Sequence, residues 1–323
     1  MLVSFIIPHK GREEMLETTV ASIVAQDYDL DQLEITIVTQ NDKLVSDFQQ
    51  APPPVSINII FRSQNDTISA LRNAGVEHSK GDYLAFLDAD IALSTNWVTA
   101  MLSELKAKTE RVLVSAVQRC ENDAPPLEKI RTALSNSSID CEVGFLAGAN
   151  LLLKKEIFIK AGGFPEHLIT CEDIYFTDRV HALGQLYYSS KANFIHLGED
   201  KTFKQLFKKE IWRGQSNLLS IKGRPISLGE LPSFLVPIWV LMFALITIIS
   251  FAFLSIEYGL LGLGLLLFPF ILYSFRLYKI AGKQLSMTSI VQFYLVYFPA
   301  RIIGSIIGLL KAIKVSGVEK KDE

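Results

Sequence analysis

The chain has 323 residues and a formal net charge of −2 at pH 7, so bulk electrostatics gives no reason to expect nucleic-acid binding. Its three cysteines are far apart and form no CxxC pair, which argues against a structural zinc site or a disulfide framework and suits a reducing compartment. Apolar residues gather between positions 234 and 310. We therefore expect a soluble domain followed by a membrane region, with the first eight residues forming a strand rather than a signal peptide.

The first part of the chain alternates between strand-like and helix-like segments. Apolar, β-rich stretches predict strands at 2–7, 33–38, 55–61, 82–87 and 112–117, with a loop at the triple proline 52–54. Apolar residues at helical spacing predict helices at 12–26, 66–78 and 95–108, and Ser94 is a candidate cap for the last. Strands alternating with helices indicate an α/β domain with a mostly parallel sheet.

The pattern becomes less regular after residue 118. Positions 119–141 are predicted to be a polar loop, 145–153 a strand, and 154–161 a short helix that ends at a Gly-Gly pair. Residues 172–183 are predicted to be helical with Thr170 as a possible cap, and 192–195 to be a short strand. We expect the soluble domain to end near residue 200.

A basic segment precedes the apolar region. Residues 201–224 carry seven basic residues against one acid, Glu210, with apolar residues at near-helical spacing. One interpretation is an amphipathic helix lying on the membrane face within a juxtamembrane segment 201–230. The other is a solvated helix packed on the soluble domain. The adjoining apolar spans favour the membrane interpretation.

The region 231–312 contains three candidate membrane segments. Residues 234–256 and 258–275 are uncharged, are separated by Glu257 alone, and predict a helical hairpin that crosses the membrane twice. Residues 289–310 are interrupted by Pro299 and Arg301, so a full span, a re-entrant segment and an interfacial helix all stay open. Basic residues before the first span and after the second predict that both ends face the cytosol. The lysines of the polar tail 313–323 would also prefer that side.

Two pairs of acids could carry chemistry. Asp88 and Asp90 follow a buried strand, where carboxylates can bind Mg²⁺ or Mn²⁺ and thereby a diphosphate. Glu172 and Asp173 open a predicted helix, and a carboxylate there could accept a proton from a sugar hydroxyl. Taken alone, each pair also fits an ordinary polar turn or favourable first-turn acids. His196 follows the last predicted strand.

Arg72 and Asn73 could hold a phosphate or close a loop. Seven segments form an ordered set: 4–8 (SFIIP), 70–75 (ALRNAG), 81–90 (GDYLAFLDAD), 148–150 (GAN), 162–166 (GGFPE), 172–173 (ED) and 178–179 (DR). With these segments in the order that the family has, the chain resembles a family 2 glycosyltransferase of the GT-A fold.

The resemblance implies a role for each matched residue. Asp173 would be the catalytic base, with Glu172 near the acceptor or the base. Asp90 would bind the metal, with Asp88 on the donor and the metal, and His196 would reach the metal or the diphosphate. The implied donor-binding residues are Pro8, Thr39, Gln40, Arg72, Asn73, Asp88, Arg213 and Gln215. Thr39 and Gln40 stand where the family usually has acids that contact the nucleobase, so the identity of the base stays open.

These features predict an inverting, metal-dependent enzyme that transfers one sugar from a nucleotide-diphosphate sugar to a hydroxyl acceptor. The QxxRW box of processive synthases is missing, because positions 212–215 (WRGQ) have those residue types in another arrangement. The expected acceptor is a lipid-linked saccharide, and the expected place is a cytoplasmic membrane of the bacterial inner-membrane type. Alternatives are transfer to a polyprenyl phosphate and a non-catalytic membrane scaffold. A dinucleotide oxidoreductase is disfavoured because no GxGxxG follows the first strand, and a transporter because the spans are few.

Overall fold

The computed structural model describes residues 1–46, 48, 55–215, 226, 228–282 and 285–319. The chain divides into two compact units, Met1–Glu121 with Ser135–Glu199 and Asn122–Leu134 with Asp200–Glu323. Each unit is described below by itself. The predicted loop at 52–54, the basic segment beyond residue 215 except position 226, and the end of the polar tail lie outside the described residues.

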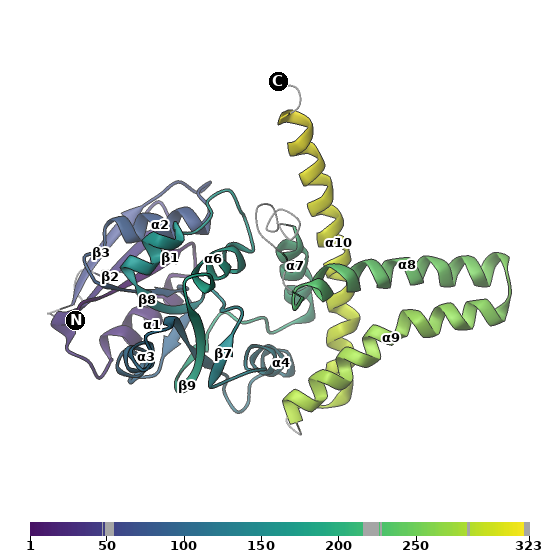
Figure 1. Ribbon diagram of the computed structural model, residues 1–323, viewed down its shortest axis with the longest axis horizontal. Helices are drawn as coiled ribbons and strands as arrows, with labels where there is room; N and C mark the ends of the chain where they lie inside the picture. The colour runs from purple at the N-terminus through teal and green to yellow at the C-terminus, as the bar shows by residue number, and fades with distance from the viewer. Residues whose placement is uncertain (47, 49–54, 216–225, 227, 283–284, 320–323) are drawn as a thin grey trace. The chain divides into compact units, whose positions relative to one another are not determined.

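The first unit is built on a nine-stranded mixed sheet (Figure 1). Its strands are β1 (Val3–His9), β2 (Leu33–Thr39), β3 (Ser56–Phe61), β4 (Tyr83–Leu87), β5 (Ile91–Leu93), β6 (Arg111–Arg119), β7 (Cys141–Val143), β8 (Asn150–Lys154) and β9 (Gln185–His196). They lie in the order β3-β2-β1-β4-β8-β6-β9-β5, and β7 pairs with β9 beside this path. The strands β3, β2, β1 and β4 are parallel neighbours, so their carboxyl ends meet at one edge of the sheet.

Helices cover both faces of this sheet. They are α1 (Glu13–Val24), α2 (Ile68–Glu77), α3 (Trp97–Lys106), α5 (Lys155–Ala161) and α6 (Glu172–His181), with a 3-10 turn η1 (Leu30–Gln32). Successive side chains of a strand point to opposite faces of the sheet. Phe5 packs in the hydrophobic core formed with α1 and α3, whereas Phe86 packs in the core formed with α5 and α6. Because both faces are covered, the central strands are mostly apolar on both sides. The predicted α/β class is confirmed.

The structure differs from the sequence prediction mainly where strands run antiparallel. The predicted strand at 145–153 is limited to β8, and the predicted strand at 192–195 is the end of the longer β9. Both β8 and the short strand β5 run antiparallel to neighbours, so the sheet is mixed rather than mostly parallel. The strands β5 and β7 were not predicted, because three residues carry too short a pattern to detect.

Two predicted helix caps and one loop are wrong. The helix α3 begins after Asn96, and Ser94 instead donates its hydroxyl to the Asn96 side chain at 2.9 Å. The helix α6 begins after Cys171, which has a φ of 64°, so the N-cap residue is Cys171 rather than Thr170. The predicted polar loop at 119–141 contains the helix α4 (Pro126–Ser135) and the strand β7. Only two apolar residues of α4, Leu127 and Ile130, are buried near its start, which is too few to show helical spacing in the sequence.

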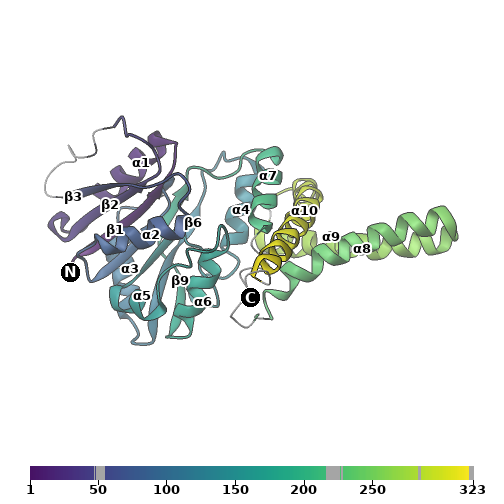
Figure 2. The same cartoon turned by 90° about the horizontal axis from the view of Figure 1, so that it is seen from above.

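The second unit is helical. Besides most of α4 it contains α7 (Phe203–Gly214), α8 (Leu231–Phe253), α9 (Ile256–Ala281) and α10 (Met287–Glu319). Figure 2 shows α8 and α9 side by side as a hairpin, as predicted for the first two apolar segments. Within the described residues, three helices are long and apolar enough to cross a membrane: Leu231–Phe253, Ile256–Ala281 and Met287–Lys311. The third continues through Pro299 and Arg301 without a break.

Small residues let α7 and α10 approach closely. A Cβ added to Gly304 on α10 would lie 2.6 Å from the carbonyl oxygen of Ile211 on α7, and one added to Gly214 would lie 2.9 Å from Gly304 Cα. Gly308 similarly meets the backbone of Gln215, so residues 304–308 form a GxxxG contact. Arg301 lies on the same stretch, with Nη1 3.7 Å from Glu210 Oε2. The basic helix α7 is therefore packed on α10.

Candidate active site

The predicted metal residues converge at the carboxyl edge of the parallel strands. Asp88 follows β4, and its backbone N–H donates to the carbonyl of Ala149 at 3.1 Å. Asp90 precedes β5, whose first residue pairs in antiparallel register with His196 at the end of β9. Ligand atoms of Asp88, Asp90 and His196 consequently lie within 4.8 Å of one another. Two carboxylates and one imidazole are ligands that suit Mn²⁺ and related divalent cations, so the donor set fits a metal.

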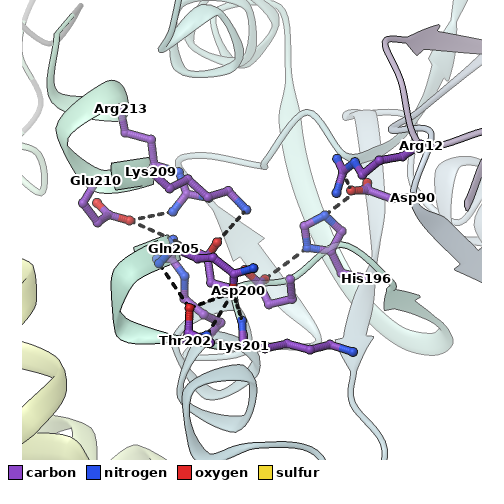
Figure 3. A network of polar contacts seen from close by, with 12 residues as sticks. Arg12, Asp90, His196, Asp200, Lys201, Thr202, Gln205, Lys209, Glu210 and Arg213 are labelled. Atoms are coloured by element: carbon purple, nitrogen blue, oxygen red, sulfur yellow. Dashed lines mark hydrogen bonds and ion pairs between the residues drawn. The ribbon is translucent and has the colours of Figure 1, made fainter. Parts of the chain in front are cut away.

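Charged groups surround Asp90 (Figure 3). His196 Nε2 lies 3.2 Å from Asp90 Oδ1, and His196 Nδ1 lies 3.1 Å from Glu199 Oε2. Burial alone would lower the pKa of His196, but the hydrogen bonds and charges of Asp90 and Glu199 raise it to about 10. Glu199 therefore orients the imidazole toward Asp90, as outer carboxylates do for ligating histidines. Arg12 Nη2 lies 3.0 Å from the other Asp90 oxygen.

A buried arginine connects the two acid pairs. Arg72 on α2 is 1% exposed, and its Nη2 lies 2.9 Å from Asp88 Oδ1 while its Nη1 lies 3.0 Å from Glu172 Oε1. Its Nη2 also donates to the carbonyl of Gly148 at 3.2 Å. A Cβ at position 148 would lie 2.9 Å from Arg72 Nη2, so only glycine leaves the guanidinium its full space. Arg72 thus fixes Asp88 and Glu172 relative to each other.

Asp173 lies beside this arginine at the start of α6. Its Oδ1 accepts a hydrogen bond from the N–H of Ile174 at 2.8 Å, and its Oδ2 accepts one from Gly148 at 3.4 Å. Burial and the charge of Glu172 raise the pKa of Asp173 to about 7, although Arg72 and the two N–H groups act in the other direction. A carboxyl group with this pKa can exchange a proton near neutral pH. The arrangement suits a general base.

The predicted nucleotide residues lie at the ends of β1 and β2. Pro8 and His9 end β1, and Thr39 ends β2 in register with His9. All three are buried, and His9 Nδ1 lies 2.9 Å from Thr39 Oγ1. Burial lowers the pKa of His9, which favours the neutral imidazole. The Thr39 hydroxyl is therefore bonded inside the protein.

Two other predicted donor residues support loops. Gln40 Nε2 donates to the carbonyl oxygens of Ser63 and Asp66 at 2.8 and 2.9 Å. Asn73 exchanges hydrogen bonds with the backbone of Phe164, donating at 3.0 Å and accepting at 2.9 Å. Arg72 is likewise bonded to protein groups. These contacts hold the three side chains in place, and their donor-binding role stays a prediction.

Arg213 and Gln215 belong to the second unit. Arg213 Nη1 lies 2.6 Å from Glu210 Oε1, which also lies 2.7 Å from Arg131 Nη2 (Arg213 and Glu210 are labelled in Figure 3). Gln215 Oε1 accepts a hydrogen bond from Lys311 Nζ at 2.6 Å. These contacts hold α7 within its own unit, and a donor-binding role for the two residues stays a prediction.

Sequence reasoning missed Arg12, Glu199 and the structural need for Gly148. A signal for Arg12 exists, because it follows β1, whose carboxyl end meets that of β4 at one edge. Glu199 stands three residues after His196, a separation at which a turn can bring the two together. In the sequence, Gly148 stands out only as the first residue of the GAN motif at 148–150. Its spatial neighbour Arg72 is 76 residues away in the chain.

The chain is similar in sequence to known glycosyltransferases. The sequence profile described as "Glycosyl transferase family 2" matches residues 4–162. The chain is 22% identical to glycosyltransferase AglE of Haloferax volcanii over 249 residues, which is 74% of this chain and 80% of that protein. It is 23% identical to an uncharacterized glycosyltransferase of Haemophilus influenzae over 215 residues, 65% and 85% of the two chains.

A solved structure shows the same fold. It is the mannosyltransferase PcManGT from Pyrobaculum calidifontis, in complex with GDP-Man and Mn²⁺, with a TM-score of 0.68 and 15% identity over 95% of this chain and 86% of that one. This likeness shows the GT-A fold, and the profile and the related sequences support a glycosyltransferase of that fold. Within that class, residues 4–162 of the chain are similar to glycosyltransferase family 2, in agreement with the resemblance seen in the sequence. In the part of the C-terminal region that the structure describes, three helices have the length and apolar composition to cross a membrane.

Proposed function

We propose that this protein is an inverting, metal-dependent glycosyltransferase that transfers one sugar from a nucleotide-diphosphate sugar to a hydroxyl group. The proposal rests chiefly on one observation: Arg72 joins Asp88, at the candidate metal site, to Glu172, which neighbours Asp173 with its pKa of about 7. Such a link fixes the donor end and the base end of one reaction relative to each other. The Mn²⁺ and GDP-Man in the similar structure support a metal and a nucleotide sugar.

The residues of the site would have separate roles in the transfer reaction. A divalent cation held by Asp88, Asp90 and His196 would neutralise the negative charge of the leaving diphosphate. Asp173 would accept the proton of the acceptor hydroxyl, whose oxygen attacks the anomeric carbon from the face opposite the diphosphate. Glu172 would raise the proton affinity of Asp173, and Arg72 would hold Glu172 in place. Inversion follows from a single displacement.

We place the acceptor on a membrane lipid. The described part of the second unit provides three helices of sufficient length and a basic helix, α7, packed against one of them. Clusters of basic residues next to apolar spans favour the cytosolic face of a membrane, where nucleotide sugars are available. A lipid-linked saccharide offers the hydroxyl group that a general base requires. A bacterial-type cytoplasmic membrane is the setting that this proposal implies.

A donor screen followed by an acceptor test examines the proposal. The full-length protein in detergent is heated with Mn²⁺ and a panel of nucleotide sugars, and the donor is expected to raise the melting temperature. That donor is then supplied with a lipid-linked saccharide or with a short-chain polyprenyl phosphate, and the anomeric configuration of the product is determined by NMR. Inverted product on the saccharide supports the proposal. Transfer only to the lipid phosphate, retained configuration, or no stabilisation by any nucleotide would each refute it.

A further inference from the structure

The loop after β1 holds an arginine in an unfavourable backbone conformation. Gly11 and Arg12 both have positive φ angles, 66° and 40°. The left-handed region is disfavoured for a residue with a Cβ, and non-glycine residues held there concentrate at functional sites. Arg12 stands directly before α1, at the carboxyl edge of the sheet. Its backbone strain suggests that its side chain has a function at this edge.

The guanidinium of Arg12 lies at the solvent side of Asp90. Its Nη2 is 3.0 Å from Asp90 Oδ2, and the side chains of Arg12 and Asp90 are 59% and 9% exposed, respectively. Asp90 is held from within by His196, which contacts the other carboxylate oxygen. An ion pair with one exposed partner restrains that partner weakly. Arg12 can therefore leave Asp90 while His196 still holds Asp90 in place.

The chain keeps space around this ion pair. Leu197 donates its backbone N–H to the carbonyl of Asp90 at 2.8 Å, which brings the next residue, Gly198, over the pair. A Cβ at position 198 would collide with Asp90 Oδ2 and with Arg12 Nη1. Any other residue would fill the volume that the guanidinium occupies. The glycine thus preserves room for a group at Asp90 Oδ2.

We propose that Arg12 binds the diphosphate of the nucleotide sugar and competes with the divalent cation for Asp90 until the donor arrives. Asp90 belongs to the group of residues that could hold the metal, and a metal ion and a guanidinium at one carboxylate repel each other. A cation would therefore favour an outward position of Arg12. There the planar fork of the guanidinium matches phosphate oxygens. This inference rests on the proposed function.

The proposal predicts two effects of opposite sign. Removing the Arg12 side chain removes a competitor for Asp90, so Mn²⁺ alone should bind about 2- to 5-fold more tightly, the range expected for loss of an exposed ion pair. The same change removes a charge-assisted bond to the diphosphate, so a nucleoside diphosphate with saturating Mn²⁺ should bind about tenfold more weakly or worse. A residue that only supports the loop would weaken both ligands together.

Calorimetry on the full-length protein in detergent separates these outcomes. Arg12→Asn suits the left-handed backbone and has too short a side chain to reach Asp90, whereas Arg12→Lys keeps the charge but loses the fork. Lys154→Ala is the matched control, because this lysine is half-exposed, pairs with an acid, and lies opposite Tyr83 at the other end of β4. Each protein is titrated with Mn²⁺, and then with ADP, GDP, UDP and dTDP at saturating Mn²⁺.

The proposal is supported when Arg12→Asn binds Mn²⁺ more tightly and the nucleoside diphosphate more weakly, with Arg12→Lys in between and the control unchanged. It is overturned when Arg12→Asn binds the nucleoside diphosphate as tightly as the unaltered protein does, or loses affinity for Mn²⁺ as well. Should Arg12→Asn not fold, Arg12→Lys decides: weaker nucleotide binding supports the proposal and unchanged binding overturns it. If the unaltered protein binds none of the four nucleotides, that result would instead refute the proposed function.

Discussion

Replacing Asp173 with asparagine tests the base directly. The change keeps the size of the side chain and removes its ability to accept a proton at neutral pH. With a pKa of about 7, the carboxyl group is about one-tenth ionised at pH 6 and about nine-tenths ionised at pH 8. The unaltered enzyme should therefore turn over about tenfold faster at pH 8 than at pH 6. Asp173→Asn should lose about 10²- to 10⁴-fold in kcat and show no such rise.

The Asp173→Asn substitution that lowers kcat should increase the stability of the folded protein at pH 8. Because the folded-state pKa of about 7 exceeds the ordinary value of 3.8, the native protein holds a proton that the unfolded chain releases between these pH values. Protonated Asp173 thus makes its full contribution to the free energy of unfolding below about pH 4, and this contribution is lost as the pH rises through about 7. Asp173→Asn stays neutral, so it should melt at a higher temperature than the unaltered protein at pH 8.

Initial rates with the identified donor, measured from pH 5.5 to 8.5, check the first expectation, and melting curves at pH 8 check the second. Glu156→Gln is the control, because this acid on α5 is 58% exposed in its side chain and lies at the opposite end of β4. Donor affinity should stay nearly the same in both variants. A rate that falls in proportion to donor affinity, or a pH profile that keeps its rise without the carboxylate, would show that Asp173 is not the base.

Three further experiments test the position of Arg72, the packing of α7 on α10, and the need for a divalent metal. Gly148→Ala should displace Arg72 and lower kcat about tenfold or more, whereas Gly144→Ala, whose added Cβ would meet nothing within 4 Å, should not. Gly304→Ala should push α10 off the backbone of α7, cost about 1–3 kcal/mol and lower the melting temperature, with Gly264→Ala as the unaffected partner. Removal of divalent metal by a chelator should stop transfer and Mn²⁺ should restore it; full activity in the chelator would contradict the assigned metal site.

The sequence predicts well those features that repeat locally. The mostly apolar runs of β1, β2 and β4 predict strands, because both sides of those strands are buried. The run of β4 also places Asp88 and Asp90 just beyond a strand end. The long uncharged runs likewise predict α8 and α9 with only small errors at their ends. In each case the determining pattern lies within one segment, so no distant partner is needed to recognise it.

The sequence predicts poorly what depends on distant partners. The antiparallel strand β5 has three residues, and its existence depends on pairing with β9, about a hundred residues later. That pairing places His196 beside Asp90 and so assembles the candidate metal group. Arg72 was expected at a phosphate because arginine suits one, yet its burial between two acids is decided by three separate segments. No local pattern encodes such a meeting.

The burial of Arg72 also limits how its neighbours can be interpreted. The guanidinium is held by Asp88 on one side and Glu172 on the other, and a charge buried without its partners is costly. Neutralising either acid therefore leaves the other less firmly held. A loss of activity in one variant can then come from weaker metal binding, from a displaced base and from lower local stability together. A double-mutant cycle through the two positions measures this coupling, because independent roles would give additive losses. The two ends of the proposed reaction are joined by one buried cation, and their energetics are accordingly not separable residue by residue.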